Sequence, residues 1–141
     1  MTSSEDFGVY LHIPISAHRC GYCAFATWSD RHHLESAYLE AVGVDVERAV
    51  QKGMPPASSI FVGGGTPSLV SADRLASAIS SIPRHEDAEI TVECNPDDVT
   101  SEGLRELCAA GVNRISLGVQ STIPHVLTSL DRTHEVENVQ H

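Results

Sequence analysis

Short aliphatic stretches alternate with longer amphipathic stretches along this chain. Short runs bounded by Gly, Pro and Asn favour strands, whereas apolar residues that recur every three to four positions favour helices. The predicted strands cover residues 8–13, 59–62, 89–94 and 113–119. The predicted helices cover residues 34–52, 71–82 and 100–111, with a short helix from about Pro124 and another beginning near Glu135. Repeated strand–helix units of this kind predict an α/β fold around a parallel sheet.

Polar residues mark the starts of two of these helices. Ser71 is predicted to cap the second helix, and Thr100 or the next residue is predicted to cap the third. Within the third helix, Leu104, Leu107 and Cys108 share one face, so all three are predicted to be buried.

Three of the predicted strands, the first, third and fourth, have one aliphatic and one polar side. In the first strand, the aliphatic residues 9, 11 and 13 alternate with Tyr10 and His12, and in the third Glu93 and Cys94 point to opposite sides. In the fourth, Leu117 belongs to the aliphatic side. Parallel strands covered on both faces are apolar throughout, so a polar face indicates strands that line a site inside a barrel.

Four strand–helix units are too few to close such a barrel. The predicted fold is therefore a partial TIM-like (β/α) barrel with about four units. Residues 1–141 are interpreted as one N-terminal part of a longer barrel domain, whose remaining units and accessory domain lie elsewhere.

The composition excludes several classes of protein. The net charge is −10 and the nine basic residues are scattered, which argues against a nucleic-acid surface. The first residues lack a signal peptide, and no apolar run is long enough to span a membrane. The four cysteines are expected to be reduced, which indicates a cytoplasmic protein. Cys94 and Cys108 are interpreted as small buried hydrophobes.

Two segments carry candidate chemistry. Cys20 and Cys23 lie in the loop after the first strand, where Ser16 precedes them by the spacing of a C-x3-C-x2-C pattern. From the loop alone, an iron–sulfur site, a pair of buried cysteines and half of a zinc site with His18 or the later histidines all remain open. The second segment is the triple glycine 63–65, whose amides could meet a ligand, although the glycines alone favour a simple glycine-rich turn.

Four segments, taken together and in this order, resemble one family. They are residues 10–25 (YLHIPISAHRCGYCAF), 61–68 (FVGGGTPS), 90–96 (ITVECNP), and 116–121 (SLGVQS) with 130–134 (LDRTH). The chain resembles the radical S-adenosylmethionine (SAM) proteins that comprise oxygen-independent coproporphyrinogen III oxidase and the HemW haem chaperone. The resemblance covers nearly the whole chain.

The resemblance implies two cofactors, a 4Fe-4S cluster and SAM. The cluster positions of the family fall on Ser16, Cys20 and Cys23. Because a serine hydroxyl stays protonated at neutral pH and ligates iron poorly, the cluster is expected to be weakened. The positions that contact SAM in the family fall on Tyr10, Tyr22, Gly64, Gly65, Thr66, Glu93, Gln120 and Arg132.

The implied function lies in haem or porphyrin metabolism. The oxidase branch carries an additional cysteine just after the third cluster position, where this chain has Ala24 and Phe25, so the chain is closer to the haem-chaperone branch. Coproporphyrinogen oxidation and a non-catalytic haem- or SAM-binding remnant remain the alternatives. The implied partners are haem or a porphyrin and a protein that reduces the cluster.

Overall fold

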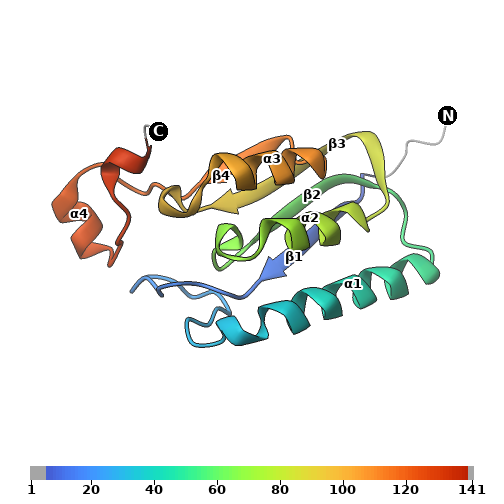
Figure 1. Ribbon diagram of the computed structural model, residues 1–141, viewed down its shortest axis with the longest axis horizontal. Helices are drawn as coiled ribbons and strands as arrows, with labels where there is room; N and C mark the ends of the chain where they lie inside the picture. The colour runs from blue at the N-terminus through green and yellow to red at the C-terminus, as the bar shows by residue number, and fades with distance from the viewer. Residues whose placement is uncertain (1–5, 140–141) are drawn as a thin grey trace.

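One four-stranded parallel sheet organises the molecule. The computed structural model describes residues 6–139, and its strands are paired in the order β1-β2-β3-β4 (Figure 1). The strands are β1 (Gly8–Ile13), β2 (Ala57–Gly64), β3 (Arg84–Cys94) and β4 (Arg114–Leu117). All three strand pairs are parallel, which confirms the predicted α/β fold with four strand–helix units.

Helices follow each strand. They are α1 (Glu35–Gln51), α2 (Ala72–Ser80), α3 (Ser101–Ala109) and α4 (Pro124–Ser129). Figure 1 shows α1, α2 and α3 side by side along the sheet, whereas α4 lies beyond its end. The helix predicted near Glu135 is a 3-10 turn over Val136–Val139. Within residues 6–139, no helix is both long and apolar enough to cross a membrane.

The core lies between the aliphatic side of the sheet and the helices. The strand register aligns Leu11, Val62, Val92 and Ile115 in one row across all four strands. The first three of these side chains are buried, and burying each contributes about 1.5–3 kcal/mol. This row fixes which side of every strand faces the helices.

The other side of the sheet carries the polar residues. One row contains Tyr10, Phe61, Thr91 and Arg114. The next row toward the strand ends includes Glu93, whose carboxylate Oε2 accepts a hydrogen bond from the Gly64 amide at 3.4 Å. The alternation predicted for Glu93 is therefore confirmed.

Three detailed predictions are wrong. Leu104 is 37% exposed and Cys108 is exposed, because Leu107 is the residue of α3 that faces the core. Leu117 is 44% exposed, since α4 does not cover the aliphatic side of β4. The Ser71 hydroxyl donates to the Asp73 carboxylate and makes no capping hydrogen bond.

Candidate functional site

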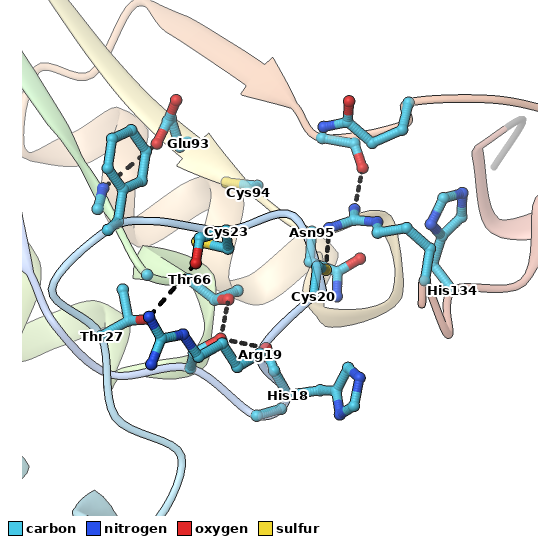
Figure 2. Close-up of a pocket in the computed structure, with 18 of the residues that line it drawn as sticks. His18, Arg19, Cys20, Cys23, Thr27, Thr66, Glu93, Cys94, Asn95 and His134 are labelled. Carbon is cyan, nitrogen blue, oxygen red and sulfur yellow. Dashed lines mark hydrogen bonds between the residues drawn. The ribbon is translucent and has the colours of Figure 1, made fainter. Parts of the chain in front are cut away.

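A cavity of about 320 Å³ opens at the carboxyl ends of the strands. Five segments surround it, namely the cysteine loop, the glycine turn after β2, the end of β3, residues 116–120 at the end of β4, and residues 132–134 (Figure 2). The predicted site residues that line it are Ser16, Cys20, Tyr22, Cys23, Gly64, Gly65, Thr66, Glu93, Gln120 and Arg132. In a parallel sheet, loops at the carboxyl ends converge, which explains how distant segments meet here.

Tyr10 is the predicted site residue that does not line this cavity. Its side chain is 56% exposed on the polar side of β1, where its hydroxyl lies 3.0 Å from His12 Nδ1. Burial and then the negative charge of Glu93 raise the pKa of Tyr10. Tyr10 is therefore electrostatically linked to the site without forming its wall.

The cysteine loop is closed at its base. The Ser16 amide donates to the Trp28 carbonyl at 3.1 Å, and the Trp28 amide donates to the Pro14 carbonyl at 2.8 Å. Within the loop, the Cys23 amide donates to the Cys20 carbonyl at 3.0 Å, which closes a turn between the two cysteines. Both cysteines are free and half-buried.

Ser16 is 8% exposed. Its hydroxyl donates to the His18 carbonyl at 2.7 Å and lies 3.4 Å from the Thr66 hydroxyl. The hydroxyl proton is therefore already used in a hydrogen bond to the backbone of the loop.

The glycine turn packs directly against this loop. Gly65 and Thr66 donate their amides to the carbonyls of Ile13 and Ile15, both at 2.7 Å. The expectation that the amides of the triple glycine are free for a ligand is therefore wrong for Gly65. A Cβ atom on Gly65 would lie 2.3 Å from the Ile15 oxygen, so the glycine is needed for this close approach.

Glu93 reaches the cavity wall because Gly63 beside it has no side chain. A Cβ atom on Gly63 would lie 2.6 Å from Glu93 Oε2, so the glycine leaves room for the carboxylate at the cavity wall. Gln120 follows β4 with a φ of 63°, a left-handed conformation that turns the chain around the same cavity.

Arg132 and His134 bring unpartnered nitrogen atoms to the cavity. Arg132 donates to the Gly118 carbonyl and, at 3.8 Å, to Cys20 Sγ, while its buried Nε has no partner. His134 is 5% exposed, and neither ring nitrogen is hydrogen-bonded within residues 6–139. Buried donors and acceptors normally have partners, so these atoms indicate a polar ligand.

Sequence reasoning assigned no role to His134 or to Asn95, although both line the cavity. Asn95 Oδ1 is likewise buried without a partner. The one sequence feature that pointed to them is that they lie in segments 130–134 and 90–96, which carry the family resemblance. Their burial depends on how two loops pack, which the local pattern does not report.

The remaining cysteine near the cavity is inert. Cys94 is 5% exposed, its thiol points to the Val92 carbonyl at 3.9 Å, and burial raises its pKa to about 11. The prediction of a buried hydrophobe is confirmed for this residue. Across the described part of the chain, no three His, Cys, Asp or Glu side chains are grouped to hold a metal ion, so the zinc alternative lacks its ligands.

Comparisons with known proteins identify the wider relationship. The profile of the radical SAM superfamily matches residues 10–140. The HemW haem chaperone of Mycobacterium tuberculosis is 40% identical over 92% of this chain and 35% of its own length. The HemW of Bacillus subtilis is 36% identical over 92% of this chain and 36% of its own length.

A solved structure shares the fold. It is that of coproporphyrinogen III oxidase (HemN) from Escherichia coli, described as a radical SAM enzyme. It has a TM-score of 0.83 and 27% identity, over 95% of this chain and 32% of that one. The chain thus spans about a third of the length of the relatives it matches.

Proposed function

Because the chain belongs to the radical SAM superfamily and is similar to HemW, we propose that it is a haem-chaperone-like SAM-binding unit with impaired cluster binding. The observation that carries this proposal is the composition of the cavity wall. It combines a carboxylate and unpartnered cationic and imidazole nitrogens with a loop that offers two thiols and one hydroxyl.

The residues of the cavity fit SAM. The buried Nε of Arg132 is a donor suited to the carboxylate of the methionine moiety. Glu93 offers a carboxylate for the ammonium group or the ribose hydroxyls. His134 has one donor and one acceptor nitrogen to offer in its neutral form.

The cysteine loop does not fit a standard 4Fe-4S cluster. In this family the cluster supplies the electron that cleaves the sulfonium of SAM. Three thiolates normally hold it, whereas this loop supplies Cys20 and Cys23 beside the Ser16 hydroxyl, which already donates to a backbone carbonyl. The proposed function is therefore ligand binding with a weak or absent cluster.

Haem or a related porphyrin is the proposed partner, because the relatives carry the name of haem chaperones. A reductant protein is needed only if the cluster forms. Coproporphyrinogen oxidation gains less support, since Ala24 and Phe25 stand where that branch adds a cysteine.

Calorimetric titration of the cluster-free chain with SAM tests the binding proposal. We expect Glu93→Gln to weaken binding about ten- to a hundredfold, because a charge-assisted hydrogen bond is lost. Glu89→Gln is the matched control: it lies on the same strand, but its exposed carboxylate pairs with Arg114 at 3.1 Å outside the cavity. Equal affinities for the Glu93→Gln variant and the unaltered chain would refute the proposal.

A further inference from the structure

A second cavity lies among the helices that cover the sheet. It is a cleft of about 310 Å³ between the starts of α2 and α3, where a Cβ atom on Gly103 would lie 3.8 Å from the Ala72 Cβ (Figure 1). The linings of this cleft and of the larger cavity have Pro67 and Cys94 in common and otherwise differ. Sites for small molecules measure about 300–1,000 Å³, so the cleft is large enough for a small ligand.

The walls of the cleft are largely apolar and carry charge of one sign. The apolar side chains that line it include Pro67, Val70, Ala72, Leu75, Val99, Leu104 and Leu107. The charged side chains among the described lining residues are the carboxylates of Asp98, Glu102 and Glu106. Such a cleft is complementary to a ligand that combines an apolar body with a positive charge.

The carboxylate of Asp98 is not compensated within the described residues. Its Oδ2 atom is buried and has no hydrogen-bond partner among residues 6–139. Burial and then the negative charge of Asp97 raise the pKa of the Asp98 carboxyl, although a hydrogen bond from Ser68 acts in the opposite direction. Buried polar atoms normally have partners, so this oxygen indicates a ligand that donates a hydrogen bond.

Helix capping does not account for this carboxylate. An acidic residue near the start of a helix often accepts hydrogen bonds from the amides of the first turn. In α3, however, the Gly103 amide donates to the Thr100 hydroxyl at 3.0 Å, and the Leu104 amide donates to the Thr100 carbonyl at 2.9 Å. Thr100 therefore caps the helix, and Asp98 contributes to the wall of the cleft instead.

We propose that this cleft binds a small organic amine in its ammonium form. The ammonium group donates a hydrogen bond to Asp98 Oδ2, and an aliphatic or aromatic body packs against the apolar side chains of α2 and α3. Glu102 and Glu106 add negative potential, which favours a cation over a neutral ligand of the same shape. The hydrogen bond is charge-assisted and partly shielded from water, and both features strengthen it.

Calorimetric titration of the iron-free chain with benzylammonium at neutral pH tests the proposal. We expect saturable binding in the millimolar range, as is typical of a ligand of this size. Benzyl alcohol has the same apolar body without the charge, and it should bind at least about tenfold more weakly. In NMR spectra of methyl-labelled chain, the shifts that benzylammonium causes should centre on Val70, Leu75, Leu104 and Leu107.

Two variants distinguish the cleft from a general attraction of cations to an acidic chain. Asp98→Asn should weaken benzylammonium binding about ten- to a hundredfold, because the charged acceptor is lost. Asp73→Asn is the matched control: it removes the same charge at the start of α2, but Asp73 is exposed and lies outside the lining of the cleft. Because solvent and salt screen an exposed charge, this variant should keep its affinity within about twofold.

Thermal unfolding separates ligand binding from a structural role of Asp98. Removing an uncompensated carboxylate should leave the unfolding temperature of Asp98→Asn unchanged or raise it. A lower temperature would show that the carboxylate stabilises the fold and would overturn the proposal.

Three binding results would also overturn it: no saturable binding of benzylammonium, equal affinities for benzylammonium and benzyl alcohol, or equal losses in the Asp98→Asn and Asp73→Asn variants. All titrations are made without SAM. Failure of SAM binding at the larger cavity would therefore leave their outcome unchanged.

Discussion

At the base of the cysteine loop, Gly65 allows β2 to approach Ile15 more closely than any side chain permits. A Cβ atom at this position would lie 2.3 Å from the Ile15 oxygen and 3.0 Å from the Ile13 oxygen. Both of these oxygens are backbone atoms, so a side chain at position 65 would fit only if β1 or the loop moved.

Gly65→Ala should therefore destabilise the fold by about 2–3 kcal/mol, as expected for overpacking against a rigid neighbour. Urea unfolding measures the change. Gly43→Ala is the matched control, because nothing lies within 4 Å of a Cβ there, in the middle of α1. It should stabilise the chain by about 0.5–1 kcal/mol through helix propensity. Equal urea midpoints for the Gly65→Ala and Gly43→Ala variants would show that the backbone around Gly65 is not rigid.

Part of the site could be predicted at this scale. The period of two along β3 placed Glu93 on the polar side and Cys94 in the core, because strand alternation is local. The partners of the Gly65 amide could not be predicted, since they depend on the register between β1 and β2. His134 was missed because loop packing, not local sequence, buries it.

Among the elements, α3 shows what local patterns predict and where they fail. Its start was predicted correctly, because Thr100 accepts a hydrogen bond from the Gly103 amide at 3.0 Å. Its buried side was predicted wrongly. Gly103 faces Ala72 at the start of α2, and a Cβ on it would lie 3.8 Å from the Ala72 Cβ. Leu107 is the buried residue of α3, and Cys108 is exposed.

Thr100→Ala should destabilise the chain by about 1 kcal/mol, because the first turn of α3 loses its capping acceptor. Ser71→Ala is the comparison at the start of α2, where the serine side chain makes no cap. We expect its effect to stay within about 0.5 kcal/mol. Thermal unfolding of both variants checks the prediction, and a larger loss for Ser71→Ala would contradict it.

β2 and β3 are also longer than the local sequence pattern predicted. Both strands begin earlier than predicted, at Ala57 and Arg84, and these two residues pair with each other. The segment 84–89 is rich in polar and charged residues, so no alternation marked it. Pairing with a neighbouring strand supplies the hydrogen bonds that hold it extended.

For the molecule as a whole, the β4 edge of the sheet is the feature that most favours association between chains. Within residues 6–139, β4 pairs only with β3 and contains four residues, with Leu117 44% exposed and Ile123 beyond it 50% exposed. Unpaired strand edges next to apolar side chains favour association between chains.

We predict that residues 1–141 in isolation self-associate and have low stability. Light scattering during size-exclusion chromatography checks the first point, and thermal unfolding checks the second. A chimera that adds the downstream part of a HemW relative should be monomeric and more stable, because a further strand would pair with β4. A chain of 1–141 that stays monomeric and unfolds cooperatively at ordinary domain stability would contradict this.

The central claim is that Ser16 impairs cluster binding, and iron and sulfide analysis after anaerobic reconstitution tests it most directly. We expect the unaltered chain to bind little of either, and Ser16→Cys to approach about four irons and four sulfides per chain. Ser29→Cys adds a thiol at an exposed position just after the loop and should change nothing. A full, stable cluster in the unaltered chain would contradict the account.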